Sequence, residues 1–287
     1  MSDILVIFNP AARSEKARST WETIERFPRC SFQPTEAIGD ARRFAVEAVA
    51  KGYKTVVAAG GDGTINEVVN GLAGSDVALG ILPVGTMNVF ANEMGLPTNL
   101  EKCWQIILAG QTRTIDLARA NGQYFVQLAG VGLDAQVVEA TSWESKKSLG
   151  PLSYVISAAQ IAARRPPKLI VEADGVTREG SFVLIGNGCR YGGPLKFFNR
   201  ALYDDGKLDV LIFKNLGYLD IARYLGTILM GTHADQPDVE YLQTERADVR
   251  CDEEEVPVEV DGEVVTKVPV TFRISSKKLK VIVGAGG

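Results

Sequence analysis

The sequence predicts an α/β N-terminal domain built on a parallel sheet, followed by a C-terminal domain that is mostly an antiparallel β-sandwich. Strand-like and helix-like segments alternate over the first 120 residues, which is typical of a parallel sheet with helices on both faces. After Asp116, short strand-like runs dominate and aspartate-glycine turn signals separate them. Short strands joined by tight turns are typical of antiparallel sheets.

Three apolar runs in the first 120 residues predict buried strands, and Asn9-Pro10 and Gly60-Gly61 end the first two of them. The predicted strands are residues 4–8, 55–59 and 77–82, and the predicted helices are residues 14–27, 41–51, 65–72 and 87–94. In the second of these helices, Phe44, Val46, Ala48 and Val49 are the predicted buried positions.

The second half is predicted to consist of strands at residues 124–128, 169–173, 182–185, 208–213, 256–260, 270–274 and 279–283, with helices at residues 152–163 and 219–230. We therefore predict one domain at residues 1–120 and a second at residues 121–275. A closing strand in residues 276–287 could return to the first domain.

Composition excludes several classes of protein. The chain has 287 residues and a net charge of −4, whereas a dedicated nucleic-acid-binding domain normally carries a basic excess. The four cysteines are far apart and none lies in a C-x-x-C pair, so neither a disulfide framework nor a zinc site is expected. Neither a signal-peptide pattern nor a run of about 18 apolar residues occurs. We therefore expect a cytoplasmic protein without a transmembrane segment, which would meet any lipid peripherally, at the membrane surface.

The strongest functional signal is Gly60-Gly61-Asp62-Gly63-Thr64-Ile65-Asn66, between a predicted strand and a predicted helix. Ligands of open α/β sheets bind beyond the carboxyl ends of the strands, where glycines let backbone N–H groups approach a phosphate. Because the carboxylate of Asp62 repels a bare phosphate, its expected use is to hold or orient Mg²⁺. The alternative is a tight turn with Thr64 as the N-cap, which the acid between strand and helix disfavours.

Residues 82–88 repeat this arrangement, since they also follow an apolar strand and open a helix. Gly85 would let the backbone approach a phosphate, and Thr86 could cap the helix or bind the nucleotide. Together the two loops predict an anion site at neighbouring strand ends. Residues 9–13 would add a third loop at this edge, although a simple strand exit explains them equally well. The chain has no G-x-x-x-x-G-K-[ST] sequence, and no G-x-G-x-x-G follows the first strand.

These motifs resemble the diacylglycerol kinase catalytic-domain family, which includes bacterial lipid kinases and sphingosine kinases and is distantly similar to NAD kinases. The order of the family's motifs is matched, nearly end to end, by Asn9-Pro10, residues 60–67, residues 80–88, Asp205-Gly206 and Asp261-Gly262-Glu263. The resemblance implies a nucleotide domain, a β-sandwich domain and an active site in the cleft between them. The implied activity is transfer of the γ-phosphate of ATP, with Mg²⁺, to a lipid hydroxyl.

Carried over by position, the resemblance implies ATP contacts at three loops and at one threonine that precedes Gly39-Asp40-Ala41. These residues are Asn9, Pro10, Ala11, Ala12, Arg13, Thr35, Gly60, Gly61, Asp62, Gly63, Thr64, Ile65, Asn66 and Thr86. The resemblance also implies an Mg²⁺ site made by the Asp205 carboxylate and the main-chain oxygens of Leu202 and Lys207. The chain departs from the family at Ala12-Arg13, where glycine or serine is common, so the shape of that loop is left open.

A catalytic base is implied within Asp261-Gly262-Glu263, and Glu263 is the residue usually assigned. Considered alone, an Asp-Gly pair between strand-like runs is most simply a hairpin turn. The alternation of valines on both sides of Asp261 and Glu263 favours a site. Phosphoryl transfer to an alcohol needs a carboxylate near the acceptor oxygen, which either acid could supply.

Two apolar segments, residues 192–198 and 219–230, could line an acyl groove, although such residues usually fill a core. The leading prediction is an ATP- and Mg²⁺-dependent lipid kinase. The alternatives are a soluble-substrate kinase of the NAD kinase type, and a nucleotide or lipid sensor without catalysis. The sequence names neither the lipid nor the oligomeric state, and a homodimer is left open.

Overall fold

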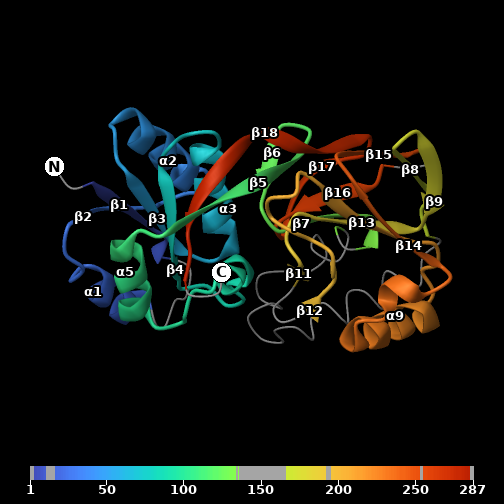
Figure 1. Cartoon of the computed structure of the whole chain (residues 1–287), viewed down its shortest axis with the longest axis horizontal. Coiled ribbons are helices and arrows are strands. Elements are labelled where there is room, and N and C mark those ends of the chain that lie inside the picture. Colours follow the sequence, from blue (N-terminus) through green and yellow to red (C-terminus); the bar gives the residue numbers. More distant parts are fainter. Residues whose placement is uncertain are drawn as a thin grey trace. The chain divides into compact units, whose positions relative to one another are not determined.

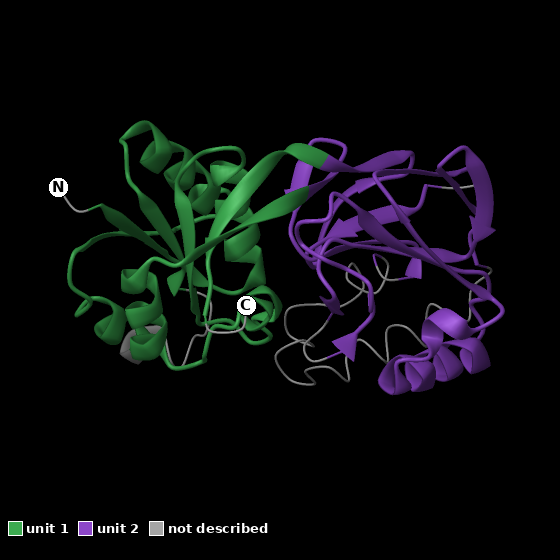
Figure 2. Cartoon of the chain, in the orientation of Figure 1, with its two compact units in different colours: residues 1–117, 275–287 green, residues 118–274 purple. Residues whose placement is uncertain are grey.

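The computed structural model describes residues 3–10, 17–133, 135, 166–191, 195–252 and 255–284. The chain forms two compact units, one of residues 1–117 and 275–287 and the other of residues 118–274 (Figure 2). Several predicted features lie outside the described residues: Ala11, Ala12 and Arg13 of the first loop, the helix at residues 152–163, and residues 192–194.

The first unit is built on a parallel sheet with the strand order β2-β1-β3-β4-β18. Its strands are β1 (Ile4–Phe8), β2 (Cys30–Pro34), β3 (Thr55–Gly60), β4 (Ala78–Pro83) and the end of β18 (Val270–Ile282). The central strands are almost continuously apolar and buried, as expected of a sheet covered on both faces. The α/β prediction is therefore confirmed.

Helices cover both faces of this sheet. They are α1 (Ala17–Ile24), α2 (Asp40–Ala50), α3 (Asp62–Leu72), α4 (Val89–Glu93) and α5 (Leu100–Ala109). In Figure 1, α1 and α5 lie on one face, and α2 and α3 lie on the other. In α2 the buried side is formed by Ala41, Phe44, Ala45 and Ala48. The prediction of Val46 as a buried residue is wrong, because the helical period turns it outward and leaves it 52% exposed.

A six-stranded antiparallel sheet with the order β14-β13-β10-β7-β16-β17 forms one layer of the second unit. Its strands are β7 (Leu128–Val131), β10 (Phe182–Gly186), β13 (Leu208–Phe213), β14 (Val239–Thr244), β16 (Pro257–Val260) and β17 (Glu263–Lys267). The facing layer contains β5 (Thr112–Ala120), β6 (Gln123–Phe125), β8 (Leu169–Ala173), β9 (Val176–Gly180), β15 (Arg246–Cys251) and the first part of β18. The predicted antiparallel β-sandwich is thus confirmed.

Strand β10 explains how this unit is packed. Val183 and Ile185 point into the core between the two layers, whereas Phe182 and Leu184 point into a second apolar cluster. The helix α9 (Tyr218–Met230) covers that second cluster with Tyr224 and Ile228. Both faces of the central strand are therefore buried, which accounts for its unbroken apolar sequence.

The segment expected as two strands, at residues 270–274 and 279–283, is the single 13-residue strand β18. It pairs antiparallel with β15 at residues 270–273 and parallel with β4 at residues 280–281. The polar sequence Ser275-Ser276-Lys277-Lys278 hides this continuity, because apolar runs are the main strand signal. Among the helices that the structure describes, none has the length and hydropathy needed to span a bilayer.

Candidate active site

The two glycine loops of the first unit meet back to back at the ends of β3 and β4. Gly60 pairs with Pro83 in the register of these parallel strands, and the Val84 N–H donates to the Gly60 carbonyl at 3.3 Å. A Cβ added to Gly85 would lie 2.4 Å from the Cα of Gly61. The two loops can be this close only because position 85 is glycine.

This contact gives a sharp test at Gly85. We expect Gly85→Ala to lower the free energy of unfolding by about 1–3 kcal/mol, because the new methyl group meets backbone that cannot rotate away. Nucleotide binding should weaken as the loops separate. The matched control is Gly226→Ala in α9, where an added Cβ meets open space and should raise stability by about 0.5–1 kcal/mol. Denaturant unfolding and calorimetric titration of ATP measure both effects, and a Gly85→Ala protein with wild-type affinity would contradict the assignment of this loop.

The first loop also joins this group. The Asn9 Nδ2 donates to the Thr64 Oγ1 at 3.2 Å, and the Asn9 N–H donates to the Ala59 carbonyl at 3.1 Å. Thr35 lies beside the same strand end, since its N–H donates to the Phe8 carbonyl at 2.9 Å. The structure therefore brings Asn9, Thr35 and the Gly60 loop to one edge of the sheet, together with the exposed Pro10.

Neither Thr64, the alternative that the sequence disfavoured, nor Thr86 is a helix N-cap. The helix α3 begins at Asp62 with Gly61 as its N-cap, and Thr64 is buried inside its first turn. Thr86 does not cap α4 either, because that helix begins at Val89 after Asn88. Thr86 is exposed at the tip of its loop, which leaves its side chain accessible from solvent.

Asp62 takes over the role expected of Thr86. Its carboxylate accepts hydrogen bonds from the backbone N–H groups of Asn88, Val89 and Phe90, at the start of α4. Negative charge is favoured there by the helix dipole. Burial raises the pKa of Asp62, against the hydrogen bonds that lower it. Its Oδ1 atom is buried and makes no hydrogen bond within the described part of the chain, so the residue can still accept a water or cation on that side.

Two further side chains of this unit hold the loops and were not singled out from the sequence. Asn88 is in the left-handed conformation, with φ of 48°, and its Nδ2 donates to the Gly85 carbonyl at 3.0 Å. Glu67 accepts from the N–H groups of Gly39 and Ala41 at 3.0 Å each, which ties α3 to the start of α2. Each is the last residue of a motif that the sequence showed, residues 60–67 and 80–88, but neither was given a role there.

The predicted metal turn lies in the second unit, directly before β13. The Oδ1 of Asp205 accepts from the Lys207 N–H at 3.0 Å, and Gly206 has a φ of 74°. Leu202 and Lys207 are exposed, so their positions are accessible. A carboxylate with main-chain carbonyl oxygens is a donor set that suits Mg²⁺. No group of three or more His, Cys, Asp or Glu side chains suited to a metal occurs among the described residues, so main-chain oxygens would have to complete such a site.

The predicted base turn joins β16 to β17. Asp261 and Gly262 both have positive φ, at 47° and 89°, as a tight hairpin turn requires. The Asp261 carboxylate accepts from the N–H groups of residues 126, 127 and 128 at 2.9–3.2 Å, so it anchors the turn to the start of β7. Glu263 is exposed at the first position of β17. The two acids therefore differ: Asp261 is engaged by backbone, and Glu263 faces solvent.

The residues suggested for an acyl groove are divided between core and surface. Phe197 and Phe198 are buried in the cluster beneath α9. On α9 itself, Tyr224 and Ile228 face that cluster, whereas Leu219, Leu229 and Met230 are exposed. Among the described residues of these segments, the exposed apolar side chains thus lie on one side of α9 and do not form a groove.

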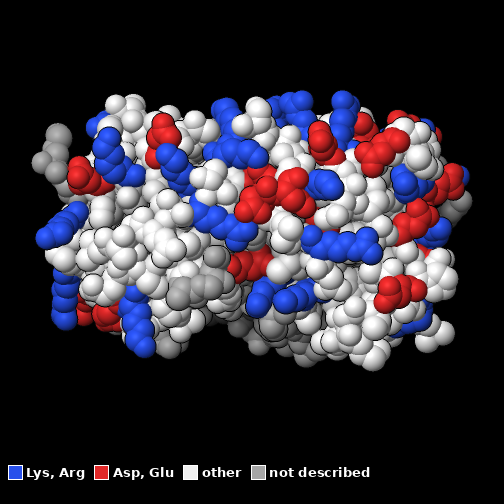
Figure 3. All heavy atoms as spheres, in the orientation of Figure 1, with Lys and Arg blue, Asp and Glu red and all other residues white. Residues whose placement is uncertain are grey.

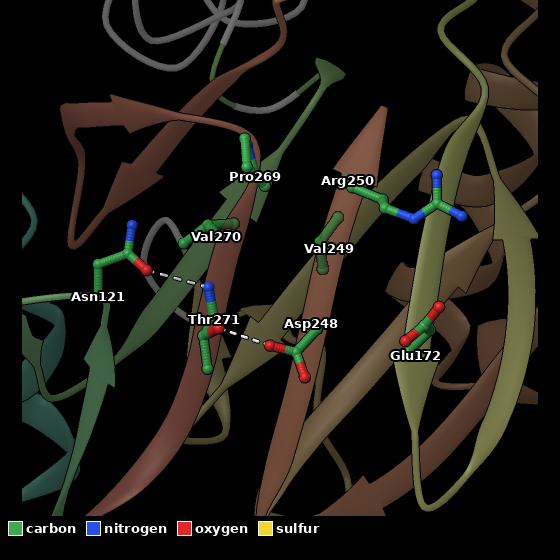
Figure 4. Close-up of a pocket in the computed structure, with 8 residues that line it drawn as sticks. All are labelled: Asn121, Glu172, Asp248, Val249, Arg250, Pro269, Val270 and Thr271. Atoms are coloured by element: carbon green, nitrogen blue, oxygen red, sulfur yellow. Dashed lines mark hydrogen bonds between the residues drawn. The ribbon is translucent and has the colours of Figure 1, made fainter. Parts of the chain in front are cut away.

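A separate pocket lies on strands β15 and β18 of the second unit (Figure 4). It is lined by Asn121, Glu172, Asp248, Val249, Arg250, Pro269, Val270 and Thr271. The Asn121 Oδ1 accepts from the Thr271 N–H at 3.1 Å, and Asp248 accepts from the Thr271 hydroxyl and the Arg246 guanidinium. These polar groups therefore hydrogen-bond to one another. None of the residues predicted for ATP, Mg²⁺ or catalysis lines this pocket.

Comparison with known proteins agrees with this arrangement. Residues 3–120 match the diacylglycerol kinase catalytic domain, and residues 127–283 match the YegS C-terminal NAD kinase beta sandwich-like domain. A diacylglycerol kinase from Bacillus subtilis (strain 168) is 31% identical over 278 residues, covering 93% of this chain and 91% of the relative. A diacylglycerol kinase from Staphylococcus carnosus (strain TM300) is 28% identical over 277 residues, covering 93% and 90%.

Solved structures give the same result. A diacylglycerol kinase from Bacillus anthracis str. Sterne superposes with a TM-score of 0.80 at 28% identity, covering 99% of this chain and 97% of the other. An NAD kinase from Archaeoglobus fulgidus, solved in complex with ATP, has a TM-score of 0.51 at 11% identity over 97% and 93% of the two chains, and therefore shares the fold alone. The protein is a kinase of this two-domain type. More narrowly, the chain belongs to the diacylglycerol kinase family.

Proposed function

We propose that this kinase transfers the γ-phosphate of ATP to the hydroxyl group of a lipid such as diacylglycerol, and that it requires Mg²⁺. The observation that carries the proposal is the back-to-back contact of the Gly61 and Gly85 loops, with Asn9 bonded to Thr64 beside them. Backbone N–H groups at such strand ends and helix starts are suited to phosphate oxygens. The names of the relatives support the lipid as the acceptor.

In this mechanism, the first unit binds the phosphates and the second supplies the acid-base group. The loop backbone and Thr86 would hold the nucleotide, together with Asn9, Thr35 and residues 60–66. Glu263 would accept the proton of the lipid hydroxyl as its oxygen attacks the γ-phosphorus. Asp261 would hold the turn that carries Glu263. Asp205 and the main-chain oxygens of Leu202 and Lys207 would hold Mg²⁺, which neutralises negative charge during phosphoryl transfer.

The exposed side of α9 supports contact with lipid at a membrane surface. Leu219, Leu229 and Met230 are 86%, 73% and 71% exposed. In the region of this helix, Figure 3 shows uncharged surface with acidic and basic side chains beside it. Apolar side chains of a helix that face water are suited to the boundary between lipid headgroups and acyl chains.

The experiment that tests the proposed activity compares a lipid with NAD as the acceptor of the phosphoryl group. The purified protein receives ATP labelled at the γ-phosphate, with either vesicles of total lipid extract or NAD. We expect label in the lipid fraction and none in NAD. Label in NAD would favour the soluble-substrate alternative, and nucleotide binding without turnover would favour a sensor.

The metal turn yields a second prediction. We expect Asp205→Ala to raise the Mg²⁺ concentration needed for half-maximal activity, because a carboxylate oxygen is the only charged ligand in the proposed set. Asp204→Ala is the matched control, as this neighbouring acid is exposed and is not among the proposed ligands. If the Mg²⁺ titration of Asp205→Ala were unchanged, the turn would not be a metal site and would only connect two strands.

A further inference from the structure

A buried side-chain hydrogen bond joins the metal turn to the start of β7. The Tyr203 hydroxyl donates to the Oε1 of Gln127 at 3.0 Å. Both residues are buried, with exposed fractions of 7% and 5%. Tyr203 lies within the turn of residues 202–207, and the two residues are 76 positions apart in the sequence. The bond therefore connects the turn to a distant part of the unit.

Gln127 is fixed at its backbone to the base turn. Its N–H donates to the Asp261 Oδ1 at 2.9 Å. Its carbonyl accepts from the N–H groups of Asn187 and Gly188 at 2.8 and 2.9 Å. Because both its N–H and its carbonyl are hydrogen-bonded, the main chain of Gln127 is fixed, and so is the position from which its side chain meets Tyr203. A single residue thus contacts Asp261 through its backbone and the metal turn through its amide.

A second network fixes the chain on the approach to the same turn. Asp209 accepts from the Tyr241 hydroxyl at 2.6 Å and from the Gln243 amide at 3.1 Å. The Tyr241 hydroxyl in turn accepts from the Arg200 N–H at 3.0 Å. These bonds hold residue 200 against β14, two residues before the turn begins. Within the turn itself, the Tyr203 bond adds a restraint to the one that the Asp205 Oδ1 makes with the Lys207 N–H.

The bond between Gln127 and Tyr203 leaves one polar group of the pair unsatisfied. The Gln127 Nε2 is buried and makes no hydrogen bond in the described part of the chain. An unsatisfied buried donor destabilises the fold, whereas replacing both partners of a buried hydrogen bond by apolar groups of the same shape can be neutral or stabilising. A methionine and a phenylalanine would fill the same space. The polar pair is therefore better explained by what it orients than by the stability it adds.

We propose that Gln127 is a positioning residue, which holds the Tyr203 side of the metal turn in a fixed relation to the Asp261 turn. The inference rests on the proposed function, since it takes residues 202–207 as the Mg²⁺ site. Metal binding and the placement of Glu263 then depend on one shared residue. Loss of the bond lets the turn relax, and divalent metal binds less tightly.

The test uses Mn²⁺ as the probe, because the paramagnetic resonance signal of the free ion reports binding without any assay of activity. The variants are Tyr203→Phe, the double variant Gln127→Met/Tyr203→Phe, and Asp205→Ala. Tyr224→Phe is the matched control, since it deletes a buried tyrosine hydroxyl of the same unit that donates to Asp238 at 2.7 Å. The melting temperature of each protein is measured in parallel.

We expect Tyr203→Phe to raise the dissociation constant for Mn²⁺ about two- to tenfold, the usual effect of one hydrogen bond. The double variant should match it in affinity, because the second substitution removes no further interaction, and should melt at or above the wild-type temperature. Tyr224→Phe should melt lower and bind Mn²⁺ normally.

Three results would overturn the inference, and each points to a different fault. If Asp205→Ala weakens Mn²⁺ binding while the double variant binds as wild type, the metal site stands and Gln127 has no positioning role. If Asp205→Ala binds Mn²⁺ as wild type, or wild type binds none, the metal assignment itself is wrong. A Tyr203→Phe protein that loses stability but not affinity would likewise show a structural bond only.

Discussion

Replacing Asp62 by alanine is expected to remove most of the kinase activity and to destabilise the first unit. Its carboxylate caps α4 through three backbone N–H groups, so alanine should lower the free energy of unfolding by about 0.5–2 kcal/mol. The loop that carries Gly85 runs from the end of β4 to the start of α4 and would shift with this helix. Misplacement of a phosphate loop by about 1 Å can cost about 100-fold in rate, so we expect at least that loss in kcat/KM.

Asp62→Asn separates the two roles of this side chain. The amide keeps the shape and one acceptor oxygen for the N–H groups of α4, but it lacks the negative charge. If Asp62 also orients Mg²⁺ through its buried Oδ1, Asp62→Asn should fold nearly as well as wild type and still lose activity and affinity for Mg·ATP. Asp76→Ala is the control, because this acid is exposed and pairs with Lys280 at the surface. Full activity in Asp62→Asn would leave Asp62 with a structural role alone.

Glu263→Gln is expected to lower kcat by about 10²–10⁴-fold while changing the KM for ATP little. The amide keeps the shape of the side chain but cannot accept the proton of the lipid hydroxyl. The decrease should fall toward the lower end of that range, since phosphoryl transfer depends mainly on positioning and charge. Because Glu263 is exposed at the first position of β17, the substitution should leave the melting temperature unchanged.

The control for this prediction is Glu255→Gln, which neutralises another exposed glutamate near the same hairpin, where it pairs with Lys267. It should retain wild-type kcat. If Glu263→Gln also kept wild-type kcat, the base assignment would be lost and Asp261 would be the remaining acid of the motif. Its carboxylate already accepts three backbone hydrogen bonds, which hold it on the start of β7.

The parts of the site that could be predicted from sequence are those whose chemistry is local. Gly60-Gly61 and Gly85 each follow a buried strand, and parallel strands necessarily end at the same edge of a sheet. That alone places the two loops together. The Asp261-Gly262 turn was likewise predictable, because two consecutive positive φ angles favour this pair of residues.

Contacts between distant residues could not be predicted in this way. Asp62 has the sequence position of a ligand, yet its hydrogen bonds go to α4, which is more than 25 residues further along the chain. Gln127 lies in no motif, and only the folded sandwich brings it to Tyr203 in the metal turn. For the same reason β2 and α5 were not predicted: β2 is short and only partly buried, and α5 has a mixed apolar pattern of which Cys103, Trp104 and Ile107 are buried by packing.

The most direct test of the central claim is mass spectrometry of the lipids that gain a phosphate. The full chain is incubated with ATP, Mg²⁺ and vesicles of total lipid extract, and the products are compared with those of the Glu263→Gln variant. The account predicts one class of hydroxyl-bearing lipid, diacylglycerol or a close analogue, that gains the mass of a single phosphoryl group in the wild-type sample and far less of it in the variant. Consumption of ATP with no phosphorylated lipid in any fraction would contradict it.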